Sequence, residues 1–141
     1  MSPMPPPTLG IRHVALTVKA LAPAEAFYVG ILGYTVEWRP DPQNVYLHLA
    51  GDNLALHQYA VGTPQDQEAF EHRRGQHLDH FGIVLKAAAD VDLWAAHLKS
   101  HGVKLSTEPK SHRDGARSFY VQDPDGNLLQ FIHHPPISDR A

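Results

Sequence analysis

The sequence predicts an α+β domain built from two copies of one β-α-β-β-β unit, folded as a curved mixed sheet around one shared cleft. Two observations predict this repeat. A strand, a helix and three further strands follow one another in the same order in each half of the 141-residue chain. The opening strands also resemble each other, as RHVALTV and DHFGIVL, and so do the closing hairpins, as GDNLALH and DGNLLQF.

The first unit is expected over about residues 11–60. Its helix, Ala22–Leu32, is amphipathic with Ala26, Phe27 and Ile31 on one face, and Gly33 is a good residue to end it. A proline pair ends the second strand, and a Gly-Asp-Asn turn joins the last two as a hairpin. The expected strands are Ile11–Val18, Tyr34–Trp38, Val45–Leu49 and Leu54–Tyr59.

Polar and proline-broken residues 61–77 predict a linker, with a helical turn at Glu68–Arg74. The second unit follows over about residues 78–135. Its helix, Ala89–Ser100, presents Val91, Trp94, Ala95 and Leu98 on one face. The last two strands are joined by the turn Asp123-Pro124-Asp125-Gly126. The expected strands are Leu78–Leu85, Val103–Ser106, Arg117–Gln122 and Asn127–His133.

Composition narrows the class of protein. The formal net charge is −3 and no run of basic residues exceeds Arg73-Arg74, so neither nucleic acid nor an anionic membrane is expected as a partner. The chain has no cysteine, which excludes disulfides, zinc-thiolate sites and cysteine nucleophiles. Residues 1–10 are proline-rich and predict a disordered or extended lead-in without the features of a signal peptide. A cytoplasmic protein is expected.

Histidine is unusually frequent, at 11 of 141 residues. It is the commonest metal ligand in proteins and it titrates near neutral pH. His13 and His80 lie near the starts of the two matching strands, on the faces expected to line the cleft. Matched positions in a repeat favour a shared role over two unrelated surface histidines.

These residues resemble the vicinal oxygen chelate superfamily, which includes glyoxalase I, extradiol dioxygenases and the fosfomycin- and bleomycin-resistance proteins. The resemblance spans Ile11 to about His133. Its most specific parts are FYVGILGY, from Phe27 to Tyr34, and RSFYVQDPDGNLLQF, from Arg117 to Phe131. The resemblance implies the predicted fold and a divalent metal in the cleft, with Fe, Mn, Ni and Zn all suited to the expected ligands.

The resemblance implies His13, His80 and Gln130 as metal ligands, where Gln130 stands in place of the usual glutamate. The glyoxalase-type ligand on the fourth strand falls on Ala55, which cannot coordinate. His57 lies two residues further on the same face, where it either replaces that ligand or contacts substrate. Gln130 is likewise either a neutral ligand or an ordinary hydrogen-bonding residue of a site that has lost its metal.

The second half also resembles the extradiol dioxygenase signature, with His112, Tyr120, the turn before Gly126, and Gln130 at the expected spacing. The resemblance implies that Tyr120 and His112 donate protons or hydrogen bonds to a bound substrate. The fourth-strand histidine of those enzymes has no counterpart here.

Three functions remain open. Extradiol-type cleavage of a small substrate with vicinal oxygens is favoured, because the three-ligand pattern suits it better than glyoxalase chemistry. A glyoxalase-type lyase or isomerase, or a fosfomycin-resistance-type transferase or hydrolase, is the alternative enzyme. A metal-free protein that sequesters a ligand, as in bleomycin resistance, is the third. A homodimer is expected, because the open edges of curved sheets tend to be covered by a partner.

Overall fold

The computed structural model describes residues 11–59, 62–73 and 78–139. The proposed lead-in, residues 1–10, lies outside these ranges. The chain divides into two compact units, with the boundary after Tyr59. Each unit contains its own four-stranded sheet with both parallel and antiparallel neighbours. No helix among the described residues is long and apolar enough to cross a membrane.

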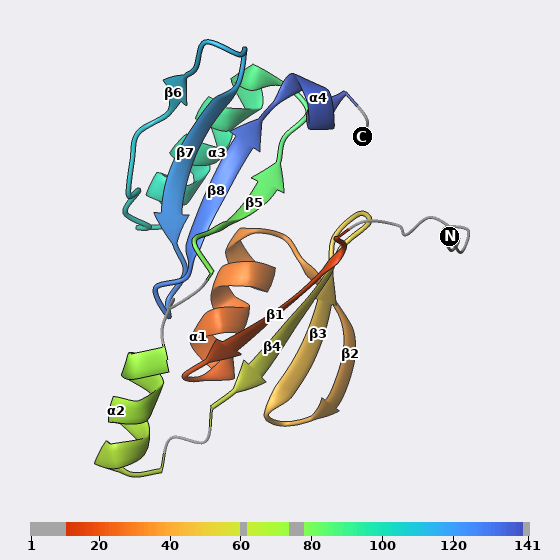
Figure 1. Cartoon of the computed structure of the whole chain (residues 1–141). Helices are drawn as coiled ribbons and strands as arrows, with labels where there is room; N and C mark the ends of the chain where they lie inside the picture. Colours follow the sequence, from red (N-terminus) through yellow and green to blue (C-terminus); the bar gives the residue numbers. More distant parts are fainter. Residues whose placement is uncertain (1–10, 60–61, 74–77, 140–141) are drawn as a thin grey trace, which may run out of the picture. The chain divides into compact units, whose positions relative to one another are not determined.

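In the first unit, the strand that opens the unit pairs with the strand that closes it (Figure 1). The strand order is β1-β4-β3-β2, in which β1 and β4 run parallel and the other neighbours run antiparallel. The elements are β1 (His13–Val18), α1 (Leu21–Glu25), η1 (Ala26–Ile31), β2 (Thr35–Asp41), β3 (Asn44–His48) and β4 (Asn53–Gln58).

The second unit repeats this arrangement (Figure 1). Its strand order is β5-β8-β7-β6, with β5 and β8 parallel. The predicted α+β class and the internal repeat are therefore confirmed. The elements are α2 (Pro64–Arg73), β5 (Phe81–Val84), α3 (Ala88–Ser100), β6 (Lys110–Ser111), β7 (Arg117–Gln122), β8 (Leu128–His133) and α4 (Pro135–Ser138).

Two strand predictions were wrong in detail. β2 does not end before Pro40 but runs through it. β2 is the edge strand of its sheet, so backbone groups on its outer side have no partner strand. A proline, which lacks an N–H, therefore costs no hydrogen bond on that side. The predicted strand at Val103–Ser106 is absent from the described structure, where only Leu105 forms an isolated bridge, to Val121. The edge position beside β7 is instead taken by the two residues of β6.

The helices also differ from the prediction. In place of a single helical turn, the segment before the second unit's sheet forms α2. Its start is fixed by reciprocal bonds: the Asp66 N–H donates to Thr63 Oγ1, and Asp66 Oδ2 accepts from the Thr63 N–H. The first helix widens into a π-helix over η1, so its apolar face shifts. Tyr28 and Leu32 are buried there, whereas the predicted core residue Ala26 is exposed.

In the second sheet, strand alternation turns one face toward α3 and leaves the other face open. On the apolar face, Phe119 and Phe131 are fully buried and stack with ring centroids 5.0 Å apart. Trp94 of α3 lies against Phe131, at 5.7 Å between centroids, so α3 covers this face (Figure 1). The predicted core residues Val91, Ala95 and Leu98 are buried on the same helix. The opposite, open face carries Ser118, Tyr120 and Gln130, together with the apolar Leu128 and Ile132.

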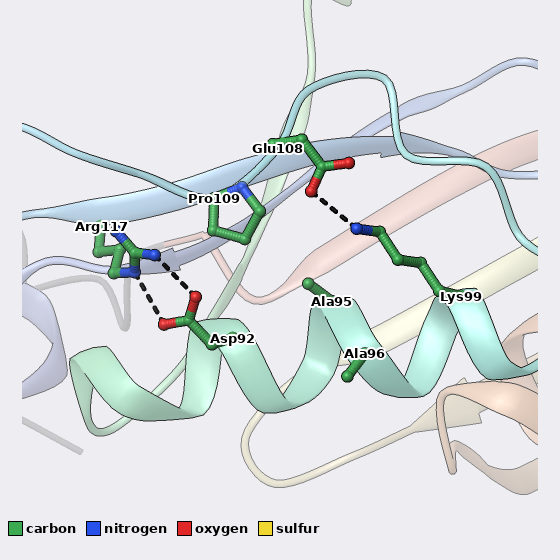
Figure 2. Close-up of a pocket in the computed structure, with 7 residues that line it drawn as sticks. All are labelled: Asp92, Ala95, Ala96, Lys99, Glu108, Pro109 and Arg117. Carbon is green, nitrogen blue, oxygen red and sulfur yellow. Dashed lines mark hydrogen bonds and ion pairs between the residues drawn. The ribbon is translucent and has the colours of Figure 1, made fainter.

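An ion pair clamps α3 to the edge of this sheet, as Figure 2 shows. Arg117 donates to both carboxylate oxygens of Asp92, at 2.9 and 2.7 Å, and to Ser111 Oγ at 2.9 Å. The guanidinium holds the pKa of the Asp92 carboxyl below its usual range. One arginine thus ties together α3, β6 and β7.

The stacked phenylalanines should dominate the stability of the second unit. Phe131→Ala removes a fully buried ring and should lower the free energy of unfolding by about 3–5 kcal/mol, measured by urea denaturation. Leu93→Ala, on the exposed side of α3, is the control and should change it by less than about 0.5 kcal/mol. Equal effects of the two substitutions would contradict the described core.

The clamp should show in the pH dependence of stability. The pKa of Asp92 is lower in the folded state than in the unfolded state. The ion pair's contribution to the free energy of unfolding is therefore fully present at pH values above the ordinary aspartate pKa, and it is lost as the pH falls through the lowered pKa. Asp92→Asn lacks this contribution. The difference in unfolding temperature between wild type and this variant, followed by circular dichroism, should therefore shrink in acid. A difference that stays constant down to acid pH would count against the ion pair.

Candidate functional site

The open face of the second sheet carries the candidate residues of this unit. In the register of β7 and β8, Tyr120 lies directly opposite Gln130, and Gly82 of β5 is the partner of Gln130 on its other side. The His80 and Tyr120 rings meet edge to face, with centroids 5.2 Å apart and planes at 88°. Since directly opposed residues place their side chains on the same face, His80, Tyr120 and Gln130 form one cluster.

His112 joins this face from a turn that precedes β7. Its Nε2 lies 3.3 Å from Ser118 Oγ, and Ser118 is on the same side of β7 as Tyr120, two residues away. Ser118 is buried while the His112 residue is exposed. The His112 backbone N–H donates to the Ala116 carbonyl at 2.8 Å, which closes the turn. The structure thus places all four predicted site residues of the second unit along one face.

In the first unit, β1 and β4 carry the other two predicted histidines. Leu16 and Val18 of β1 and Leu54 and Leu56 of β4 are buried in the core. The residues that alternate with them on the two strands point to the opposite face. This alternation places His13 and His57 on one face, as predicted. His13 is aligned with Asn53, whereas His57 is aligned with Thr17, four residues further along. At about 3.3 Å per residue, the two histidines stand roughly 13 Å apart along the strands.

The three candidate metal-ligating histidines each present Nδ1 to an oxygen. His13 Nδ1 lies 2.7 Å from Asn53 Oδ1, and His80 Nδ1 lies 2.6 Å from Asp79 Oδ2. His57 Nδ1 lies 2.6 Å from Asn44 Oδ1. An acceptor beside Nδ1 favours the tautomer with its proton there, which leaves Nε2 with a lone pair. This is the orientation of metal-ligating histidines, so the donor chemistry of His13 and His80 fits a divalent metal.

The three predicted metal ligands do not all belong to one unit. His13 belongs to the first unit, and His80 and Gln130 belong to the second. Within the described ranges, no group of three or more His, Cys, Asp or Glu side chains is gathered so that it could hold a metal. The proposed third ligand, Gln130, is an amide and carries no charge. Its oxygen can coordinate a cation but adds less electrostatic attraction than a glutamate.

An aromatic pair on the first unit's open face was not predicted. Trp38 is 58% exposed and stacks on Tyr46 with ring centroids 5.1 Å apart. Tyr46 also meets the His57 ring edge to face, at 5.9 Å. The alternation of β3 could have placed Tyr46 beside Ala55, its register partner. The orientation of Trp38 depends on an irregularity in β2 that the sequence does not signal.

The acidic and amide partners of the histidines were also missed. Asp41 accepts from the Gln43 N–H and from Asn44 Nδ2, and these bonds hold the pKa of its carboxyl low. Asn44 in turn presents its oxygen to His57. Sequence spacing cannot find such partners, because Asn44 and His57 meet only through the register of β3 and β4.

Comparison with known proteins places this geometry in a family. The chain is 29% identical over 127 residues to the uncharacterised protein YaeR of Escherichia coli strain K12, covering 85% of this chain and 92% of that protein. It is 28% identical over 134 residues to a catechol-2,3-dioxygenase of Bacillus subtilis strain 168, covering 91% of this chain. The match spans only 42% of that dioxygenase's length.

Solved structures share the fold. A lactoylglutathione lyase from Agrobacterium tumefaciens matches with a TM-score of 0.70 and 21% identity, over 90% of this chain and 95% of the other. The fosfomycin resistance protein FosX from Listeria monocytogenes matches with a TM-score of 0.69 and 19% identity, over 89% and 93%. The family model of the glyoxalase/bleomycin resistance protein/dioxygenase superfamily matches residues 10–131. The chain belongs to this superfamily.

Proposed function

We propose that this protein is a metal-dependent enzyme acting on a small substrate with two neighbouring oxygens, and that ring-cleaving oxygenation of the extradiol type is its reaction. The observation that carries the proposal is the face shared by His80, Tyr120 and Gln130, which His112 joins through Ser118. The 28% identity to a catechol-2,3-dioxygenase supports the same reaction.

In this proposal, the residues that would hold a metal are His80, through Nε2, and Gln130, through its amide oxygen, in the second unit, and His13, through Nε2, in the first. Iron is the metal that suits oxygenation, whereas Mn, Ni or Zn suits the alternative enzymes. A bound metal would supply Lewis-acid chemistry, by withdrawing electron density from the neighbouring oxygens of a substrate. Asp79 serves the site by holding the Nδ1 proton of His80.

The neighbouring side chains handle the substrate's protons. The Tyr120 hydroxyl donates a hydrogen bond to one substrate oxygen, and the edge-to-face contact with His80 fixes the orientation of its ring. His112, on an exposed turn and bonded to Ser118, is available to accept or return a proton. His57 lies roughly 13 Å from His13 along the strands, which is too far for the two to share one ion, so we assign it to substrate contact rather than coordination.

Glyoxalase-type chemistry is less well supported. It needs a carboxylate ligand and base on the fourth strand, and that position holds the buried Ala55. A metal-free, ligand-sequestering protein has one observation in its favour, which is the exposed Trp38 stacked on Tyr46. Such a pair suits the stacking of a planar aromatic molecule.

One experiment separates these functions. The untagged protein is reconstituted anaerobically with Fe(II), and oxygen uptake is measured with a panel of catechols. Uptake supports the proposal. Turnover of a hemithioacetal or an epoxide with Ni, Mn or Zn, without catechol-dependent uptake, would replace it with lyase or transferase chemistry. Failure to bind any metal, together with binding of an aromatic drug, would leave the sequestering protein.

We also propose that the protein forms a homodimer. β2 and β6 lie at one edge of their sheets, and β1 and β5 lie at the other. Unpaired strand edges favour association with a second copy. Light scattering at micromolar concentration should give the mass of a dimer, and a monomeric mass would contradict this proposal.

Gln130→Glu should tighten divalent metal binding. The substitution adds a negative charge at a proposed ligand position without changing the length of the side chain, and we expect an affinity gain on the order of tenfold, measured by titration calorimetry with Zn²⁺. Gln67→Glu adds the same charge on the exposed α2 and serves as the control. An unchanged affinity for Gln130→Glu would mean that Gln130 is not a ligand.

Tyr120→Phe should slow turnover more than it weakens substrate binding. The hydroxyl's bond strengthens as charge develops on the substrate oxygen, so we expect kcat to fall by about 10²-fold with a small change in KM. Tyr34→Phe is the matched control, because it also removes one tyrosine hydroxyl. That hydroxyl donates a hydrogen bond to Asp52 at 2.7 Å, and Tyr34 is not one of the proposed site residues. It should lower stability and leave kcat unchanged. A change confined to KM in Tyr120→Phe would show that the hydroxyl only binds substrate.

A further inference from the structure

β2 contains a bulge that changes which face Glu37 occupies. Val36 is aligned with Leu47 of β3, and Trp38 is aligned with Tyr46. Two steps along β2 therefore correspond to one step along β3, which leaves Glu37 as the extra residue. Leu47 is buried in the core, whereas Tyr46 lies on the open face. The bulge thus brings Glu37 and Trp38 to the open side, where regular alternation would have separated them.

From this position, Glu37 reaches the partner of His13. Glu37 Oε2 accepts a hydrogen bond from Asn53 Nδ2 at 2.6 Å, and Asn53 Oδ1 lies 2.7 Å from His13 Nδ1. β3 lies between β2 and β4 in the sheet, so the Glu37 side chain spans one strand to make this bond. A side chain on the core face could not make it.

We propose that Glu37 is a positioning residue that fixes the tautomer of His13 through the amide of Asn53. This inference rests on the proposed function, in which His13 binds a metal through Nε2. A carboxylate can only accept hydrogen bonds, so it holds the Asn53 NH₂ group on its own side. The Asn53 oxygen must then face His13, and His13 must carry its proton on Nδ1.

Removal of Glu37 should release this arrangement. The Asn53 amide could then rotate and present its NH₂ group to His13, which favours a bare Nδ1 and a proton on Nε2. That tautomer has no lone pair on Nε2 for a metal. His80 needs no such relay, because Asp79 is itself a carboxylate and cannot present a donor. His57 has a comparable relay, in which Asn44 donates to Asp41.

The test is the ring ¹⁵N spectrum of metal-free protein, because it reads the tautomer without any metal or turnover. Long-range ¹H–¹⁵N correlations are recorded at about pH 8, where imidazole is neutral, for wild type, Glu37→Ala, Glu37→Gln and Glu108→Ala. His13 is assigned by its loss in His13→Gln. Glu108→Ala removes an exposed carboxylate of the second unit and controls for charge.

Wild type should show His13 with its proton on Nδ1, and Glu37→Ala should shift the population toward Nε2–H. Glu37→Gln can present either its oxygen or its NH₂ group to Asn53, so it no longer forces one orientation and should give a population between wild type and Glu37→Ala, while Glu108→Ala should match wild type. In a parallel Zn²⁺ titration, Glu37→Ala should lose about tenfold in affinity. A wild-type His13 already protonated on Nε2, or a tautomer unchanged in Glu37→Ala, would overturn the inference.

The titration separates this inference from the proposed function. If His13→Gln binds Zn²⁺ as tightly as wild type, the proposed metal ligand is wrong, whatever the tautomer does. If His13→Gln loses affinity while the tautomer is unchanged in Glu37→Ala, the metal ligand stands and the role of Glu37 is overturned.

Discussion

The parallel pairing of the first and last strands of each unit determines which face of the sheet each candidate residue occupies. In the second unit, β5 beside β8 sets Gly82 opposite Gln130, and the antiparallel β7 then sets Tyr120 on the other side of Gln130. A slip of one residue in either pairing would move these side chains to the face covered by α3. The buried stack of Phe119 on Phe131 opposes such a slip, because it would expose both rings. Core packing on one face therefore fixes the chemistry of the other.

The two units use this framework differently. In the second unit, the open face gathers His80 and Tyr120 beside Gln130, and Arg117 ties the strand that carries Tyr120 to the helix behind it. In the first unit, His13 and His57 are each tied to an asparagine, and each of these asparagines is tied to a carboxylate. Asparagine can face either way, so its carboxylate decides which nitrogen of the histidine carries the proton. The repeat supplies matching positions, and local hydrogen bonds determine the state of the imidazole there.

Periodicity in the sequence predicted the elements of the repeat because burial imposes it. The alternation in HVALTV predicted that His13 lies on the face opposite Leu16 and Val18, and Gly33 does follow its helix with a positive φ of 85°. What failed depended on contacts distant in sequence. Pro40 lies within a strand only because β2 has no neighbour on one side. The roles of Glu37 and Trp38 depend on a bulge, and alternation alone would place them on opposite faces.

The candidate site residues were named through family resemblance, and within each unit they lie on one face of the sheet. Their partners were not predictable, because Asn53, Asn44 and Ser118 have no motif of their own and act only through register and turn geometry. The central claim is that His80 and its neighbours hold a metal. Elemental analysis of untagged protein, in wild type and in His80→Ala, tests it most directly. We predict a stoichiometric divalent metal in wild type that is lost in His80→Ala. Metal-free wild type after reconstitution, or full metal content in His80→Ala, would contradict the account.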